Sequence, residues 1–321
     1  MGIPTHGRPG FVTEAIESVL GQTYQELRLL VAEDGTGGGE IAAAVEPYLS
    51  DPRVRYEPWG EHLGAARTMA RIVEGASGEY VGILHDDDRW YPEWLERRVV
   101  FLEEHPDCGM AFGEHLDIDE TGATVGRSRG CELAPGPQDR GGFFRAMQRH
   151  NLIGTPTVLV RRSAYELAGG PFDERFELVW DWEMMLRLAL AAPVGYLPVW
   201  DADYRTHTHQ ISARARRGRA YLALFEATGA MAKRAGPEFE LGPEERRGMY
   251  ARHLLSAALD EAEQGHRQAA LRLLRSGARA RPRAALSPVA GAVALGLVSP
   301  RLVAATRQRV YTKRVRPERP A

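Results

Sequence analysis

Cysteine and lysine are scarce in this chain of 321 residues, which holds two of each. Cys108 and Cys131 lie far apart and outside any CxxC pair, so the sequence excludes a disulfide-held scaffold and a zinc site built on thiolates. Two isolated thiols fit a reducing, cytoplasmic compartment. Because arginine supplies nearly all of the positive charge, we give arginine counts little weight as a sign of a particular ligand.

Long apolar runs are also missing. No stretch of 18 apolar residues occurs, and the first ten residues, MGIPTHGRPG, lack the apolar segment of a signal peptide. The most apolar stretch, residues 289–298, lies between Pro288 and Pro300 and is too short to cross a bilayer. The sequence therefore predicts a cytoplasmic protein without a spanning helix.

A strong net charge is absent as well. The formal value is −2 at pH 7, which gives no reason to expect nucleic acid as a partner. The charge is unevenly distributed, because residues 213–321 carry 22 Arg and Lys against 9 Asp and Glu and leave residues 1–212 acidic. An acidic region that handles a phosphate-bearing ligand needs a metal ion or a local basic pocket.

The basic C-terminal region allows two interpretations. Its charge can simply keep a helical cap in solution, or it can dock peripherally on anionic lipid at the inner face of the membrane. The second interpretation comes from the apolar segment 288–303 and the basic residues after it, Arg307, Arg309, Lys313 and Arg314.

Strand-like and helix-like segments alternate through the first half of the chain. Helical spacing of apolar residues covers 11–20, 41–49, 64–74 and 94–105, and short apolar runs cover 27–32, 54–57, 80–84 and 109–113. This alternation predicts an α/β fold with a mainly parallel, helix-covered sheet. Residues 119–142, rich in glycine, proline and charge, are expected to form a loop.

From about residue 220 the pattern becomes all-helical. Helices are predicted over 221–234, 244–264 and 267–279. We therefore expect two parts, an α/β domain over residues 1–212 and a helical C-terminal extension over residues 213–321.

Two acidic clusters follow predicted strands, at the strand ends where α/β sheets bind ligands. Asp86, Asp87 and Asp88 come directly after the strand at 80–84. Three adjacent carboxylates repel one another and need a compensating cation, and their oxygen atoms suit Mg²⁺ or Mn²⁺ bound to a phosphate. The alternative is a solvated acidic turn in which Asp88 caps the following helix.

Asp34 follows the neighbouring strand, in the run Glu33-Asp34-Gly35. Its carboxylate could accept hydrogen bonds from a ribose hydroxyl or a base N–H, or it could belong to a plain turn. The glycines after it do not follow the spacing of a phosphate-binding loop.

Asp181 lies between Trp180 and Trp182 at the start of a predicted helix. Partial desolvation by the two indoles would suit a general base. The alternative, which the sequence alone favours, is a helix N-cap beside core tryptophans.

Histidine and arginine pairs supply further candidates. His207 and His209 are two residues apart, so one could contact a metal ion or phosphate, although no closed zinc site is expected. Arg67 and Arg71, one helical turn apart, could face a diphosphate or could be ordinary surface arginines.

Taken in this order, these elements resemble the family 2 glycosyltransferases of the GT-A fold. The matching segments are IPTHGRP at 3–9, AIESVLGQTY at 15–24, EDG at 33–35, GAAR at 64–67, GEYVGILHDDDRW at 78–90, RR at 161–162, GGPFD at 169–173, WDWE at 180–183 and YRTHTHQIS at 204–212. Each segment is weak alone, but the ordered set is specific. It implies a GT-A nucleotide-binding α/β sandwich over residues 1–212.

The resemblance also implies a reaction. A sugar would pass with inversion from a nucleotide diphosphate-sugar, with a UDP-sugar favoured, to a hydroxyl of a saccharide or lipid-linked acceptor in polysaccharide or glycoconjugate synthesis. Asp181 would be the catalytic base, and Asp88 and His207 would hold Mn²⁺ or Mg²⁺. The positions that match the family's donor site are Pro4, Thr5, Arg8, Asp34, Arg67, Asp86 and Asp87.

Three positions depart from the family's pattern. The first strand is reduced to Met1–Ile3. We therefore expect either that the sequence starts too late or that the sheet is poorly supported at this point. His85 stands where many relatives carry Asp, and Thr68 replaces a usual Asn.

Two other functions fit a similar fold. A nucleotidyltransferase would carry a Gly-rich basic loop ending in Lys after the first strand, whereas this chain has PTHGRP there. A catalytically silent binding module is the second, and the intact Asp34, Asp86, Asp88 and Asp181 speak against it.

Overall fold

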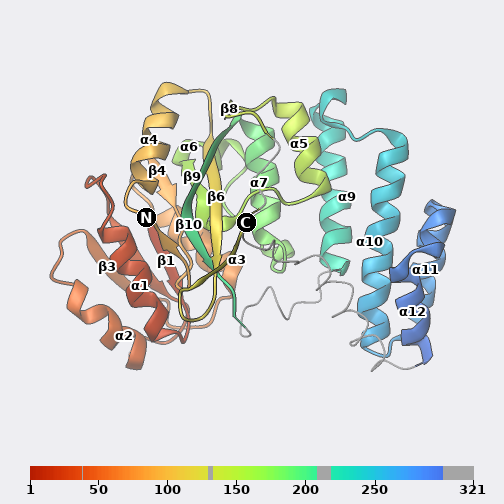
Figure 1. Cartoon of the computed structure of the whole chain (residues 1–321), viewed down its shortest axis with the longest axis horizontal. Helices are drawn as coiled ribbons and strands as arrows, with labels where there is room; N and C mark the ends of the chain where they lie inside the picture. The colour runs from red at the N-terminus through yellow and green to blue at the C-terminus, as the bar shows by residue number, and fades with distance from the viewer. Residues whose placement is uncertain (38, 129–132, 208–217, 299–321) are drawn as a thin grey trace, which may run out of the picture. The chain divides into compact units, whose positions relative to one another are not determined.

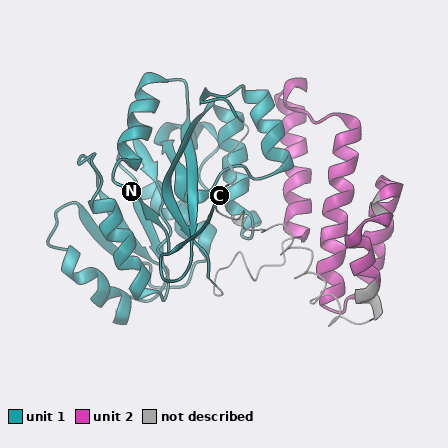
Figure 2. Cartoon of the chain, viewed as in Figure 1, with its two compact units in different colours: residues 1–208 teal, residues 209–321 magenta. Residues whose placement is uncertain are grey.

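The computed structural model describes residues 1–37, 39–128, 133–207 and 218–298. The chain divides into two compact units, residues 1–208 and 209–321 (Figure 2). The predicted domain boundary, between residues 212 and 213, lies outside the described residues.

Unit 1 alternates strands and helices as predicted (Figure 1). Its strands are β1 (Gly2–Thr5), β2 (Leu29–Glu33), β3 (Val54–Pro58), β4 (Tyr80–Gly82), β5 (Arg89–Trp90), β6 (Met110–Ile118), β7 (Thr124–Arg127), β8 (Gly136–Pro137), β9 (Val158–Arg161) and β10 (Val194–Arg205). Its helices are α1 (Pro9–Leu20), α2 (Gly39–Val45), α3 (Ala65–Gly75), α4 (Trp94–Glu104), α5 (Arg140–Arg149), α6 (Arg162–Leu167) and α7 (Trp180–Ala191).

The strands form two sheets that meet at β1. One sheet is parallel, in the order β1-β2-β3, and the other runs β4-β9-β6-β10-β5, with β7 beside β6 and β8 beside β10. Short as it is, β1 joins the sheets, because Gly2 forms a parallel bridge with Ile83 and its carbonyl accepts a 3.0 Å hydrogen bond from the Leu84 amide.

The combined architecture is α/β with a mixed sheet. The predicted parallel pairing holds for β1–β3 and for β6 with β10, whereas β9 pairs antiparallel with both β4 and β6. The apolar face of α1 explains its place against the sheet, since Val12, Ala15, Ile16 and Val19 recur at helical spacing and are buried.

The loop predicted over residues 119–142 was wrong in three places. β7 pairs antiparallel with β6, β8 pairs antiparallel with β10, and α5 begins at Arg140. Such short strands, built around glycine and proline, carry too few apolar alternations to predict a strand.

β10 was not predicted, although at twelve residues it is the longest strand that the structure describes. Pro198 lies in its middle, where the register against β6 shifts between Tyr196 and Ala202. A proline in a strand interior normally argues against a strand, and here an irregularity in the pairing accommodates it.

A buried ion pair fixes β10 to α4. Arg98 is fully buried and donates to both Asp201 oxygens, at 2.8 and 2.9 Å, and its Nε donates to the Thr157 carbonyl at 2.8 Å. Its guanidinium also lies over the Trp94 ring, 4.3 Å from the centroid.

Unit 2 confirms the predicted helices, as α9 (Gly218–Ala235), α10 (Pro243–Glu263) and α11 (Arg267–Ala280), and adds α12 (Pro288–Val298). Small residues let α10, α11 and α12 pack closely around Ala258, Ala262, Ala270, Ala292 and Val293. Over the described residues, no helix combines the length and apolar character needed to cross a bilayer.

We predict that Asp201→Asn lowers the free energy of unfolding of unit 1 by about 3–5 kcal/mol, because it leaves the buried Arg98 guanidinium without a counter-charge. Urea denaturation followed by tryptophan fluorescence measures the change. Asp51→Asn, which removes the same charge from a surface pair with Arg53, is the matched control and should cost at most ~1 kcal/mol. Equal losses in the two variants would contradict the prediction.

Candidate active site

Polar side chains gather at the carboxyl ends of β1, β2 and β10 and in the turn after β4. Three carboxylates, those of Asp86, Asp87 and Asp88, form the centre of the site and are 1%, 7% and 1% exposed. Charges buried to this degree need partners, and each carboxylate has a different set.

Asp86 turns toward β1. The Thr5 hydroxyl donates to Asp86 Oδ2 at 2.8 Å, and the His6 amide donates to the same oxygen at 3.4 Å. Arg8 Nη2 lies 3.0 Å from the other oxygen, Oδ1. Asp86 therefore ties the end of the first strand to the turn after β4.

Asp87 is the most strongly paired of the three. Its Oδ2 accepts a short hydrogen bond from Arg8 Nη1 and lies 2.9 Å from His207 Nε2. His207 follows β10 and is 9% exposed, so β10 brings a residue 120 positions away onto the acidic turn.

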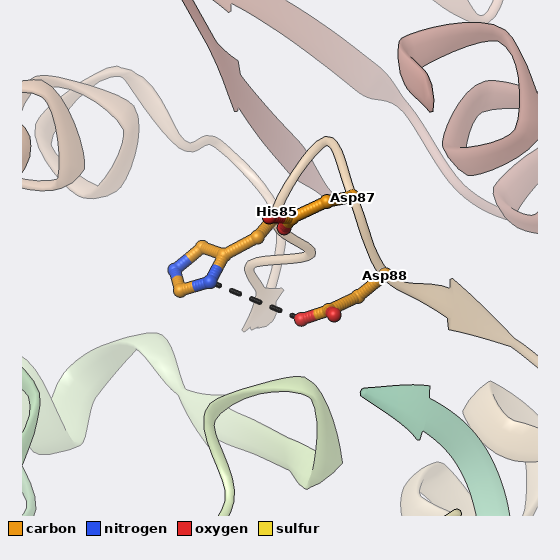
Figure 3. Close-up of side chains that lie close together, drawn as sticks. All are labelled: His85, Asp87 and Asp88. Carbon is orange, nitrogen blue, oxygen red and sulfur yellow. Dashed lines mark ion pairs between the residues drawn. The ribbon is translucent and has the colours of Figure 1, made fainter. Parts of the chain in front are cut away.

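Asp88 has one satisfied oxygen and one that is not. Oδ1 accepts a 2.9 Å hydrogen bond from the Arg205 amide at the end of β10. Oδ2 is buried and accepts no hydrogen bond within the part of the chain that the structure describes. The His85 imidazole lies near it, with Nδ1 3.9 Å from Oδ2, as the dashed line in Figure 3 marks.

His85, Asp87 and Asp88 fit a divalent cation. Each offers one ligand atom, and these atoms lie within 4.8 Å of one another (Figure 3). An imidazole and two carboxylates suit Mn²⁺, and the unsatisfied Asp88 Oδ2 is the type of buried oxygen that a cation would satisfy.

The pKa values of the carboxylates differ with their partners. Burial raises the pKa of Asp86 to about 6, and burial together with the charges of Asp87 and Asp86 raises the pKa of Asp88 well above its usual range. Burial also acts on Asp87, but Arg8, His85 and His207 hold its pKa below the ordinary value. Burial therefore disfavours the charged form of Asp86 and Asp88 more than their partners favour it.

Arg205 supplies a fully buried cation beneath the turn. Its Nε donates to the Asp87 carbonyl at 2.8 Å, and its Nη2 donates to Glu14 at 2.7 Å. The guanidinium also lies 4.6 Å from the centroid of the Phe11 ring. The Arg205 guanidinium therefore holds the backbone of the acidic turn.

Asp34 lies at the end of β2, and its carboxylate contacts the His62 imidazole, with Nδ1 3.0 Å from Oδ2, as well as two backbone amides. Its two oxygens accept from the Leu63 amide at 2.5 Å and the Gly64 amide at 3.1 Å, just before α3 begins. The next two amides, of Ala65 and Ala66, donate to Glu177 at 2.8 and 3.2 Å. Two carboxylates thus occupy four consecutive amides at the start of α3, the helix that carries Arg67.

Asp181 lies in the first turn of α7. Asn151 Nδ2 donates to its Oδ2 at 3.5 Å, and the neighbouring Trp180 ring meets the His85 ring edge-on at 5.8 Å between centroids. Burial lowers the pKa of His85, and the Asp87 and Asp181 carboxylates oppose that shift. Asp181 therefore lies within electrostatic reach of the histidine that borders the acidic cluster.

The sequence comparisons place the chain in a family. A family model described as glycosyl transferase family 2 matches residues 1–167, which is more than half of the chain. The chain belongs to glycosyl transferase family 2.

Two curated relatives illustrate the likeness. A Haemophilus influenzae protein named an uncharacterized glycosyltransferase is 24% identical over 206 residues, and the Mycobacterium tuberculosis protein Rv1520 is 27% identical over 217 residues. The matches cover 63% and 64% of this chain. The chain spans 64% and 58% of the lengths of these relatives, less than two thirds of either.

Solved structures confirm the predicted GT-A fold class. S. aureus TarS 1–349 in complex with UDP-GlcNAc has a TM-score of 0.66 at 15% identity, with 97% of this chain and 91% of that chain covered. The mannosyltransferase PcManGT from Pyrobaculum calidifontis, in complex with GDP-Man and Mn²⁺, has a TM-score of 0.54 at 17% identity, covering 97% and 86%.

The structure brings most of the sequence candidates of this family 2 chain to one place. Thr5, Arg8, Asp86, Asp87 and His207 are joined by direct contacts, and Asp88 accepts from the Arg205 amide at the end of β10. Pro4 and Asp34 lie at the adjoining strand ends. Arg71 lies over the Trp59 ring, and His209 is outside the described residues.

Sequence reasoning missed His85 as a possible ligand, as well as Arg205 and Glu177. His85 adjoins the three aspartates and could have been added on that ground. Arg205 and Glu177 reach the site from far along the chain, so no local pattern could have indicated their partners.

We predict that Glu177→Ala raises the hydrogen-exchange rates of the Ala65 and Ala66 amides by about two- to fivefold, because an anion at a helix N-terminus stabilises its first turn modestly. Amide exchange followed by NMR measures the rates. The Leu63 and Gly64 amides, bound by Asp34, are the internal control and should be unchanged. Unchanged rates at Ala65 and Ala66 would show that Glu177 does not hold the helix.

Proposed function

We propose that this chain is an inverting, metal-dependent glycosyltransferase that uses a nucleotide diphosphate-sugar, with a UDP-sugar favoured. The observation that carries the proposal is the buried cluster of Asp86, Asp87 and Asp88 at the strand ends of a family 2 chain, in which Asp88 Oδ2 accepts no hydrogen bond from a described residue. The acceptor would be a hydroxyl of a saccharide or lipid-linked saccharide, in cell-surface polysaccharide or glycoconjugate synthesis.

The donor would lie along the ends of β1 and β2. Asp34 would face the nucleoside, with Pro4 and Thr5 beneath it and Asp86 near the ribose, while Arg8 and Arg67 would face the diphosphate. Similarity to structures that hold UDP-GlcNAc and GDP-Man supports a nucleotide-sugar as the ligand class. The choice of UDP rests on the sequence resemblance.

Mn²⁺ or Mg²⁺ would be held by Asp88, as the sequence predicts, together with Asp87 and His85. His207 was predicted as a ligand, and its 2.9 Å contact with Asp87 would let it orient that carboxylate or bind directly. When bound, the ion would neutralise the charge that develops on the departing diphosphate.

Asp181 would act as the catalytic base. Its carboxylate takes the proton of the acceptor hydroxyl while that oxygen bonds to the anomeric carbon, and the bond from this carbon to the diphosphate oxygen breaks. A single displacement of this kind inverts the anomeric configuration and needs no covalent intermediate. The electrostatic proximity of Asp181 to His85 supports this role.

We predict that one of UDP, GDP and dTDP binds the wild type in the presence of Mn²⁺, and that Asp88→Ala weakens this binding at least ~10-fold by removing a metal ligand. Isothermal titration calorimetry with and without Mn²⁺ measures both. Asp181→Asn is the matched control: it should bind the nucleotide as the wild type does, while sugar transfer falls by about 10²–10⁴-fold. A folded wild type that binds none of the three nucleotides would favour the silent binding module.

The C-terminal unit would add peripheral contact with anionic lipid at the inner face of the membrane. Helix α11 contains no acidic residue, and Arg272, Arg275 and Arg279 recur along one exposed face. None of these three forms an ion pair with a residue that the structure describes. The basic residues beyond 298 that first motivated this idea lie outside the described residues.

We predict that the wild type floats with vesicles that contain anionic phosphatidylglycerol and not with phosphatidylcholine vesicles. Replacing Arg272, Arg275 and Arg279 with Gln should weaken binding ~100-fold, because each arginine near a charged bilayer contributes about 1 kcal/mol. Replacing Lys233, Arg234 and Arg246 with Gln removes the same charge from α9 and α10 and should have less effect. Flotation that is independent of anionic lipid would reject the contact.

A further inference from the structure

Arg8 occupies an unusual position for a cation next to a metal site. Its guanidinium bridges two carboxylates, with Nη1 on Asp87 Oδ2 and Nη2 3.0 Å from Asp86 Oδ1, and Nη1 also lies 3.4 Å from His207 Nε2. Asp87 is at the same time one of the three residues whose ligand atoms converge. Arg8 and a cation bound by His85, Asp87 and Asp88 would therefore share one carboxylate.

Two cations on one carboxylate oppose each other. The Arg8 charge neutralises part of the negative potential that attracts a divalent ion, so it weakens the binding of the ion alone. A diphosphate reverses this effect, because its oxygens can contact the ion and the guanidinium together. Because the ion and Arg8 then both contact the diphosphate, each of them strengthens its binding.

The Arg8 side chain is accessible to a ligand from solvent, and its backbone is fixed separately. Its side chain is 32% exposed, whereas Asp86 and Asp87 beneath it are almost fully buried. Its backbone is held independently, since its carbonyl accepts a 3.2 Å hydrogen bond from the Val12 amide at the start of α1. Arg205 differs, because its fully buried guanidinium is fixed by backbone carbonyls and Glu14.

We infer that Arg8 is the residue that couples metal binding to diphosphate binding: it disfavours the ion alone and favours the ion together with a nucleoside diphosphate. The inference rests on the proposed function and adds a mechanism to it. Its consequence is that the acidic cluster holds a divalent ion tightly only when the donor is present. Coupling of this kind is reciprocal, so the ion raises the affinity for the diphosphate by the same factor.

The test measures Mn²⁺ binding to the full chain by electron paramagnetic resonance, with and without a saturating amount of whichever of UDP, GDP and dTDP the wild type binds. In Arg8→Gln, Mn²⁺ alone should bind about tenfold tighter, and the enhancement of Mn²⁺ binding by the nucleotide should fall at least ~10-fold. Arg8→Lys keeps the charge and should retain most of the coupling.

Arg89→Gln is the matched control. The Arg89 side chain is 31% exposed, close to the value for Arg8, but it pairs with Glu14 and Asp203 instead of Asp86 and Asp87, so the coupling should be that of the wild type. Circular dichroism checks that each variant is folded.

The outcomes separate the two proposals. If Arg8→Gln leaves both Mn²⁺ affinity and coupling unchanged, or if Mn²⁺ alone binds more weakly, Arg8 has no coupling role, while nucleotide-dependent Mn²⁺ binding by the wild type would still support the donor site. If the folded wild type binds neither Mn²⁺ nor any of the nucleotides, both the coupling and the proposed function are wrong.

Discussion

Burial of three consecutive carboxylates is the constraint on which the rest of unit 1 depends. Asp86, Asp87 and Asp88 are nearly inaccessible to water, and each would be costly there without a partner. The chain supplies those partners from both ends of the domain: Thr5 ends the first strand and Arg8 precedes α1, while Arg205 ends the last strand and His207 follows it. The site therefore forms only when β1 and β10, nearly 200 residues apart, are both correctly placed in their sheets.

Further contacts in unit 1 fix the elements that carry the site residues. β10 carries Arg205 to the turn, and the Arg98–Asp201 pair holds that strand against α4. On the other side, Asp34 and Glu177 hold the start of α3 through four successive amides. Glu177 lies three residues before α7, so the anchored segment leads directly to the helix that begins with Trp180 and Asp181. The start of α3 and the segment before α7 are thus joined by hydrogen bonds from backbone amides to the Glu177 side chain.

Local patterns predicted those parts of the fold in which periodicity is strong. The apolar stripe of α1 and the strand at Leu29–Glu33 follow from side chain spacing, and so do α9, α10 and α11. β10 was not predicted because Pro198 and the run Asp201-Ala-Asp203 interrupt the alternation of apolar and polar residues that indicates a strand. Its acidic residues are tolerated in a strand only because Arg98 and Arg89 lie opposite them, which no window of neighbouring residues can show.

The sequence by itself determined the chemistry available to this protein: an α/β framework, acidic residues at strand ends, and an ordered set of motifs typical of family 2. Side chain spacing and residue type suffice for these, because they depend on near neighbours. Only the tertiary structure decided which partners each acidic residue contacts. Asp86 turns to Thr5, Asp87 to Arg8 and His207, and Asp88 to Arg205 with one oxygen left toward His85. The partners differ because buried charges need hydrogen-bond partners, and each carboxylate finds them on the strands that the fold brings within hydrogen-bond distance.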